Sequence, residues 1–290
     1  MLKIFADTDC DIDAKIAKEH DLGLISMPYI EGDREIRPYV DWQEFEGHAF
    51  YDRLRRGELA STCGLSPENY IEYFEPVFVA GDDILYVHFS ANMTSTFNAM
   101  RLALLELQER YPQRKFYAID CKAITIGARA IVLDVIDMKE SGKSIEEIME
   151  WAKTGVEHYA CYFYADNLRF FARSGRVSGI SATMANLLSI KPIINMDSEG
   201  KMGAVAKAKG RINAMNKVLD YVEALQDDMK NHRVIIAHTD APVWAEKFVA
   251  LFKQRFGEGY KLEMVLVNPT AGAHCGPDTI GICFHAKSRQ

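Results

Sequence analysis

A run of neutral hydroxyl side chains follows an apolar, strand-like segment in the first third of the chain. The segment ILYV at residues 84–87 leads into HFSANMTSTF at residues 88–97, which supplies Ser90, Thr94 and Thr96 but no glycine and no formally charged residue. The end of a strand is where α/β proteins usually hold a ligand. Hydroxyls and the N–H groups of a helix start bind an anion without a formal positive charge, because the helix dipole supplies part of the field. The run therefore favours binding of a single carboxylate over binding of a polyphosphate.

Two other loops have the same character, STCGLSPENY at residues 61–70 and NPTAGAHCGPDTIG at residues 268–281. If the three loops meet at one pocket mouth, Thr62, Thr94 and His274 offer two hydroxyls and an imidazole. Each residue also has a structural interpretation. Thr94 suits the cap of a following helix, Thr62 suits a turn, and His274 suits a structural hydrogen bond as well as a ligand-binding or catalytic role.

Two basic segments are further candidates. Arg173 and Arg176 bracket a Ser-Gly turn, and an apolar helix is expected after it, around residues 184–188. A guanidinium presented by such a turn binds a phosphate or carboxylate, although solvated surface is the more common role for arginine. Farther along, KAKGR brings together Lys207, Lys209 and Arg211. We expect these three side chains to be exposed, either as plain surface or as a docking patch for a partner protein.

The segments that must position these residues alternate between strand and helix patterns. LKIFADT leads into DCDIDAKIAKEH, where Asp9 or Asp11 suits a helix cap, ILYVHFS leads into TFNAMRLALLELQERY, and KFYAID leads into ARAIVLDVIDMKESG. This alternation predicts a three-layer α/β/α domain with a parallel sheet and a ligand at the carboxyl ends of its strands.

Beyond residue 160 the pattern is less regular, and it predicts a second α/β domain with a mixed sheet. Strands are expected at LLSIKPIINM, GAVAKAK, RVIIAH, LEMVLVNPT and TIGICFHA, with AGAHCGPD as a tight loop between the last two. We divide the chain into domains at residues 1–160 and 161–290, with the ligand between them.

The composition excludes several classes of protein. With 290 residues, 48% of them apolar, the chain can bury a large core, and its net charge of −7 argues against a nucleic-acid or polybasic membrane surface. No run approaches the roughly 20 apolar residues of a membrane span and no secretory signal is recognisable, so we expect a cytoplasmic protein. Neither GxxxxGK nor GxGxxG occurs. The six cysteines form no CxxC pair, and we expect no metal and no cofactor.

Taken together, these segments resemble the DegV family of bacterial fatty-acid-binding proteins, the acyl-carrying subunits of fatty acid kinase. The resemblance covers nearly the whole chain. It depends on the order and spacing of ADTDCDI, TCGLSPENY, SANMTSTF, RSGRVSG followed by LLSIKPII, KAKGR and GAHCGPDTIG.

The resemblance implies a function for the candidate residues. One long-chain fatty acid would lie in a tunnel between the two domains, with its carboxylate in a network of hydroxyls and a histidine that corresponds to Thr62, Thr94 and His274. A kinase partner would bring ATP and convert the carboxylate to an acyl-phosphate for phospholipid synthesis. Arg176 matches the family arginine near the head group or the partner. The chain itself would carry no catalytic apparatus, and the fatty acid would be a ligand, not a cofactor.

Two other functions remain as alternatives. The first is a stand-alone hydrolase that uses His274 as the base for a serine or threonine nucleophile, although GxSxG is absent and no aspartate is tied to His274 by any pattern. The second is a regulatory DNA-binding protein, which the acidic balance disfavours.

Overall fold

The computed structural model describes residues 1–178 and 189–289. The helix expected around residues 184–188 lies outside the described residues. Within these ranges, no helix combines the length and the apolar character that crossing a membrane requires.

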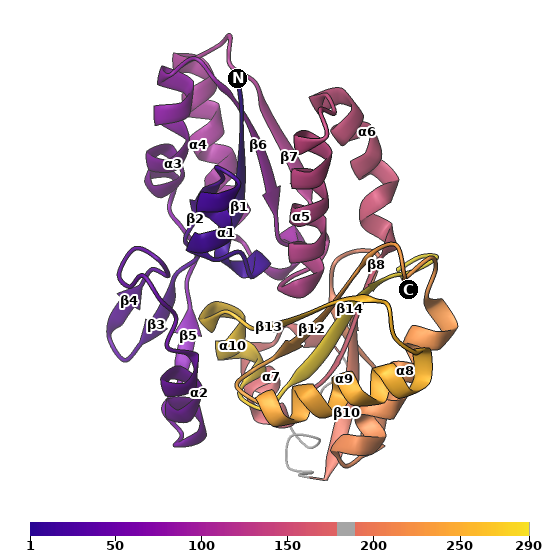
Figure 1. The fold of residues 1–290 in the computed structure, drawn as a ribbon. Helices are drawn as coiled ribbons and strands as arrows, with labels where there is room; N and C mark the ends of the chain where they lie inside the picture. Colours follow the sequence, from indigo (N-terminus) through magenta and orange to yellow (C-terminus); the bar gives the residue numbers. More distant parts are fainter. Residues whose placement is uncertain (179–188, 290) are drawn as a thin grey trace.

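The first half of the chain builds a parallel sheet with helices on both faces (Figure 1). Its four strands have the order β2-β1-β6-β7, and they are β1 (Leu2–Asp7), β2 (Gly23–Ile25), β6 (Asp83–His88) and β7 (Phe116–Asp120). Helices α3 (Pro67–Val79) and α4 (Thr96–Arg110) lie on one side and α5 (Ile126–Glu140) on the other, with α6 (Ile145–Gly155) beside it. The three layers explain why residues 84–87 are entirely apolar and fully buried, since both faces of the strand are covered.

The turn after β1 differs from the expectation. Helix α1 (Ala14–Glu19) begins later than predicted, because Asp13 accepts the hydrogen bond of the Ile16 N–H at 2.8 Å and caps the helix. Asp7 caps a single 3-10 turn, η1 (Thr8–Cys10). Asp9 and Asp11 are therefore not helix caps, and their carboxyl groups are buried.

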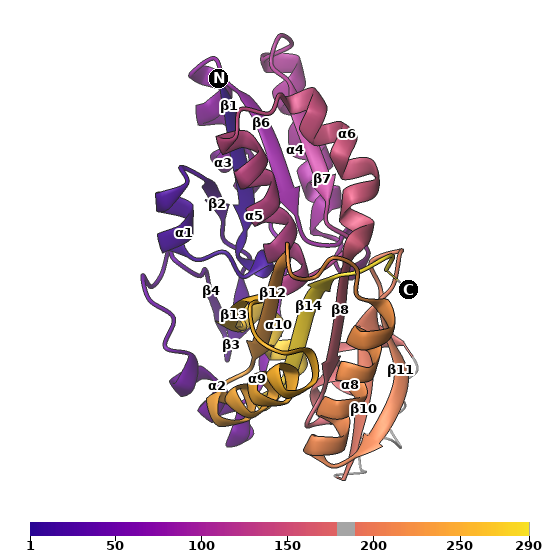
Figure 2. The same cartoon turned by 45° about the vertical axis from the view of Figure 1, so that its right-hand side comes forward.

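The second half of the chain builds a mixed sheet of seven strands in the order β13-β12-β14-β8-β10-β11-β9 (Figure 2). These strands are β8 (Tyr159–Tyr164), β9 (Val177–Ser178), β10 (Ile190–Met196), β11 (Met202–Lys209), β12 (Arg233–His238), β13 (Lys261–Leu266) and β14 (Ile280–His285). Helices α8 (Arg211–Leu225) and α9 (Pro242–Phe256) cover one face. Helix α5 contacts β8, β12 and β14 as well as β6, so it lies between the two sheets.

A third, small sheet and three helices close the side of the molecule. The small sheet is antiparallel with the order β4-β3-β5, formed by β3 (Tyr29–Glu31), β4 (Arg34–Ile36) and β5 (Ala60–Thr62). The helices are α2 (Gly47–Arg55), α7 (Leu168–Ser174) and α10 (Pro269–Cys275). The prediction of a tight loop at AGAHCGPD is wrong in part, because its first half belongs to α10. Pro269 starts that helix, and the Asn268 side chain accepts a hydrogen bond from the Ala271 N–H at 2.9 Å.

The fold class predicted from sequence, a three-layer parallel α/β unit followed by a mixed-sheet α/β unit, is confirmed. The parallel sheet uses residues 2–120 and the mixed sheet residues 159–285, and α5, α6 and the 3-10 turn η3 (Val156–His158) connect them. The domain division at residues 160 and 161 stays a prediction.

Candidate functional site

A pocket lies between the mixed sheet and the carboxyl ends of the parallel strands. Its empty space, open solvent at the mouth included, is about 1030 Å³. The parallel sheet contributes the segments that follow β1, β6 and β7, and the mixed sheet contributes the faces of β8, β10, β11, β12 and β14. The ligand position predicted from the strand–helix alternation is therefore where the structure has its pocket.

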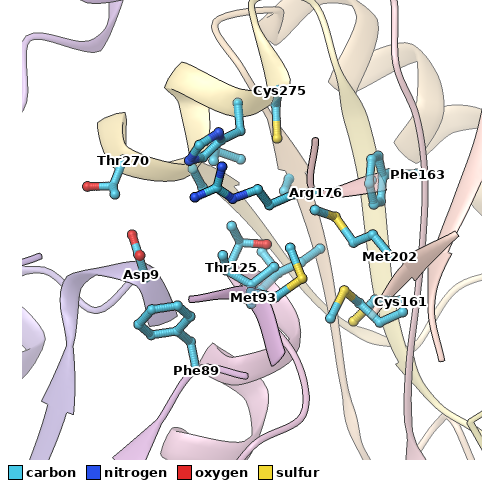
Figure 3. A pocket seen from close by; sticks show the side chains of 18 of the residues that line it. Asp9, Phe89, Met93, Thr125, Cys161, Phe163, Arg176, Met202, Thr270 and Cys275 are labelled. Atoms are coloured by element: carbon cyan, nitrogen blue, oxygen red, sulfur yellow. The ribbon is translucent and has the colours of Figure 1, made fainter. Parts of the chain in front are cut away.

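Most of the pocket wall is apolar. In Figure 3, Phe89 and Met93 approach from the parallel sheet, and Cys161, Phe163 and Met202 approach from the mixed sheet. The other apolar wall residues include Met27, Ile124, Ile126, Met196, Ala237, Val267 and Ile282. Among the lining side chains of the described chain, only those of Asp9 and Arg176 belong to the strongly acidic or basic types. Such a wall suits a hydrophobic ligand with few polar groups.

Thr62 and His274 form the hydrogen-bonded centre of the polar part of the wall. The Thr62 Oγ1 and His274 Nε2 atoms are 3.0 Å apart, although the two residues are 212 positions apart in the chain. Strand β5 ends at Thr62, and His274 is in the last turn of α10. In the tautomer with a hydrogen on Nε2, the imidazole donates to Thr62, and the Thr62 hydroxyl hydrogen is then free to bind a ligand.

Thr94 lies both next to the start of α4 and in the pocket wall. Its Oγ1 accepts a hydrogen bond from the Thr96 N–H at 3.2 Å, just where α4 begins, and the same residue lines the pocket. Because the accepted bond uses only the oxygen, the hydroxyl hydrogen remains available. Thr96 differs, since its hydroxyl oxygen bonds the Leu65 N–H at 2.9 Å and the Tyr70 hydroxyl at 3.1 Å.

Arg176 brings a positive charge to this part of the pocket (Figure 3). Burial, together with the positive charges of Arg176 and Arg173, lowers the pKa of His274 to about 4. His274 is thus a neutral imidazole near pH 7. This part of the wall therefore combines neutral hydroxyls and a neutral imidazole with the guanidinium of Arg176, an exposed residue.

This arrangement can bind an amphipathic anion: a carboxylate at Thr62, Thr94, His274 and Arg176, and an apolar chain against the methionines and the sheet faces. A family model for uncharacterised proteins of the DegV family matches residues 1–287. The chain belongs to the DegV family. A DegV domain-containing protein from Clostridium perfringens is 29% identical over 290 residues, covering 99% of this chain and 98% of the relative.

Solved structures share the DegV fold over its whole length. A stearic-acid-binding protein from Eubacterium ventriosum superposes with a TM-score of 0.87 at 19% identity, covering 99% of each chain. A fatty-acid-binding DegV family protein from Thermus thermophilus superposes with a TM-score of 0.84 at 19% identity, covering 98% of this chain and 99% of that one. These similarities establish the fold of the present DegV chain.

The basic segment of this DegV protein is only partly as expected. Lys207 and Lys209 are exposed on β11, but Arg211 is partly buried and engaged. Its guanidinium forms two hydrogen bonds with the Asp166 carboxylate, at 2.7 and 3.0 Å, and lies 4.9 Å from the ring centre of Trp244. The expectation that Arg211 is exposed is therefore wrong, since its guanidinium binds Asp166 and stacks on Trp244 within the fold.

Asp9 and Thr270 are among the polar pocket residues that the sequence reasoning does not select. Asp9 follows β1, so the rule that selected the segment after β6 applied to it as well. It was assigned instead to helix capping. Thr270 gave no signal, because α10 was not expected to be a helix.

Proposed function

We propose that this DegV protein binds a long-chain fatty acid in the pocket and presents its carboxylate to a fatty acid kinase. The kinase would transfer a phosphoryl group from ATP to make an acyl-phosphate for phospholipid synthesis. The observation that carries the proposal is an apolar pocket with hydroxyls, an imidazole and a guanidinium in its wall. The fatty acids bound by solved relatives support it.

The energetics favour this kind of ligand. Each buried CH₂ group contributes about 0.8 kcal/mol, so a long acyl chain supplies most of the affinity. Removing the carboxylate from water is costly unless hydrogen bonds replace its hydration. In this proposal Thr62, Thr94 and His274 supply those bonds, and Arg176 supplies the countercharge.

The kinase step explains why the polar groups sit beside exposed residues. Arg176 is exposed as well as pocket-lining, so in this proposal it contacts both the head group and the incoming phosphoryl group. Lys207 and Lys209 form a candidate docking patch for the partner, while Arg211 serves the fold. The sequence has no nucleotide-binding loop of the usual types, so the partner brings the ATP, and a cytoplasmic location is part of the proposal.

The test has a binding part and a transfer part. Native mass spectrometry of freshly purified protein should detect a co-purified fatty acid, and the delipidated protein should bind oleate or palmitate. A protein that is consistently empty and rejects both acids would refute the proposal. For the transfer part, a fatty acid kinase subunit with ATP should form acyl-phosphate only from loaded protein. Transfer from free fatty acid at the same rate would remove the carrier role.

A stand-alone hydrolase is the second candidate, and the Thr62–His274 hydrogen bond is the observation in its favour. Efficient general bases have a pKa near the operating pH, whereas that of His274 is lowered to about 4. We therefore rank this function below lipid binding. Turnover of a panel of ester substrates that His274→Ala abolishes would reverse the ranking.

A further inference from the structure

Asp9 is an acidic residue held in the pocket wall without the partners that acids usually have. Its side chain is only 5% exposed, and among the described residues its Oδ1 atom has no hydrogen-bond partner. Figure 3 shows Asp9 facing Thr270 across one side of the pocket. A buried polar atom without a partner is rare in native proteins and points to a missing ligand or water.

The backbone holds Asp9 in this position. The residue belongs to the 3-10 turn that Asp7 caps. Its carbonyl oxygen accepts a hydrogen bond from the Thr125 N–H at 2.7 Å. Thr125 has a φ of 52°, which is unusual for a β-branched residue and marks a constrained junction between the loop and α5. These contacts hold the backbone of Asp9 against the start of α5, beside the pocket.

The neighbouring acids show which hydrogen bonds Asp9 lacks. Asp7 accepts hydrogen bonds from the Tyr86 hydroxyl and two backbone N–H groups, and Asp11 accepts two from Asn268. Asp9 has no comparable donors. Burial raises the pKa of Asp9 well above its usual value, and the negative charges of Asp7 and Asp11 raise it further.

The hydrogen-bond pattern then fixes which atom faces a ligand. The Thr270 hydroxyl donates its single hydrogen to the Met27 carbonyl oxygen at 3.0 Å. With that hydrogen used, the Thr270 hydroxyl has none left to donate to Asp9. The unpartnered Oδ1 of Asp9 therefore remains an acceptor in the pocket wall without a donor among the described residues.

This acceptor is distinct from the head-group site. Thr270 and His274 are four residues apart on α10, so they lie on one helix face with Cβ atoms roughly 5–6 Å apart. A carboxylate at His274 does not satisfy Oδ1 of Asp9, because an ionised carboxylate has no hydrogen to donate. A ligand hydroxyl at that level does satisfy it.

We propose that Asp9 and Thr270 form a second polar subsite that accepts a hydrogen bond from a hydroxyl group on the acyl chain, so that the preferred cargo is a hydroxylated fatty acid. This inference rests on the proposed function, since it names the class of fatty acid that the same pocket selects. The hydroxyl would satisfy an acceptor that a plain acyl chain leaves buried and unpaired, a difference worth roughly tenfold in affinity.

The experiment compares stearic acid with monohydroxystearic acids that differ only in the position of the hydroxyl, including the 3-, 10- and 12-isomers. Dissociation constants are measured by calorimetry on delipidated full-length protein. For each protein the readout is the ratio of the stearate constant to that of the best hydroxylated isomer. We expect a ratio of roughly ten for the wild type.

Two variants of Asp9 provide matched controls. Asp9→Asn should keep the ratio, because it retains a side-chain carbonyl oxygen that can accept a hydrogen bond from the ligand hydroxyl. Asp9→Leu has a similar size but no acceptor, and its ratio should fall to about one. Thermal unfolding of each variant checks that it folds, and Asp9→Asn keeps the test decisive if Asp9→Leu does not.

Three outcomes would overturn the inference. A wild-type ratio of one or less, with stearate still bound, refutes the second subsite and leaves the proposed function intact. A high ratio that persists in Asp9→Leu, or one that is lost in Asp9→Asn, shows that the Asp9 side-chain oxygen is not the acceptor of the ligand hydroxyl. Failure of every fatty acid to bind refutes the proposed function and this inference with it.

Discussion

The most direct test of the head-group site is the substitution Thr62→Val, which replaces a hydroxyl with a methyl group of nearly the same size. It removes the 3.0 Å hydrogen bond to His274 Nε2 and, in the proposed complex, a hydrogen bond to the carboxylate. A hydrogen bond to a charged group contributes about 1.5–3 kcal/mol, so the dissociation constant for oleate should rise by roughly tenfold to 150-fold. The empty protein should lose only about 1 kcal/mol of stability, for the lost bond to His274.

Thr62→Ser is the matched control, because it keeps the hydroxyl and loses only a methyl group. Oleate binding is measured by calorimetry on delipidated protein, and the free energy of unfolding by urea titration of the empty forms. The reasoning fails if Thr62→Val binds oleate within twofold of the wild type. It fails equally if Thr62→Ser loses as much affinity as Thr62→Val, since the hydroxyl would then not be the cause.

Three further predictions follow from the pocket. Arg176→Gln should weaken oleate binding about fivefold, since an exposed charge pair contributes up to about 1 kcal/mol. The same substitution should raise the pKa of His274 in an NMR titration. An unchanged pKa would contradict the proximity of the Arg176 charge to the His274 ring. The pKa of His274 is lowered to about 4, so between about pH 6.5 and 4 the unfolded chain binds a proton at this residue and the native state does not. Acidification over that window should therefore reduce the free energy of unfolding of the wild type by up to about 3 kcal/mol more than that of His274→Gln. Asp7 and Asp11, whose pKa values are raised to about 6, act in the opposite direction but cancel in this comparison, and parallel urea-derived stability curves for the two proteins would refute the assignment. Ala237→Leu should fill part of the apolar wall with about three carbon atoms and weaken stearate binding by up to about 50-fold, while laurate binding changes much less; equal losses for the two acids would show that no acyl chain reaches residue 237.

The parts of the site that sequence could predict are those governed by strand ends. An apolar run followed by hydroxyl side chains predicts a binding segment after β6. The carboxyl ends of parallel strands lie along the same edge of the sheet however far apart they are in the sequence, so the segments that follow them come together there. Thr94 could therefore be selected from pattern alone. Thr62 and His274 were selected from loop composition, and the structure brings them to the same pocket.

The parts that sequence could not predict depend on long-range contacts. Helix α10 is only seven residues long, too short for a periodic pattern, and it is held by packing: a Cβ on Gly272 would lie 2.4 Å from the Tyr51 hydroxyl oxygen. The role of Arg211 depends on Asp166 and Trp244, which no spacing connects to it. The residue that caps α1 could not be chosen among Asp9, Asp11 and Asp13 from sequence, because the choice depends on where the chain turns after β1.

The position of β14 has a consequence for when the proposed lipid binding can begin. This strand follows the other pocket-lining strands in the chain but is inserted between β12 and β8, in the interior of the mixed sheet. A nascent polypeptide synthesised only as far as α10 already contains Thr62, Thr94 and His274. It still lacks β14, the strand that joins β12 to β8 in the mixed sheet. Since domains assemble as units during translation, we expect loading to begin only after residue 285 has left the ribosome, so that unfinished chains do not sequester lipid.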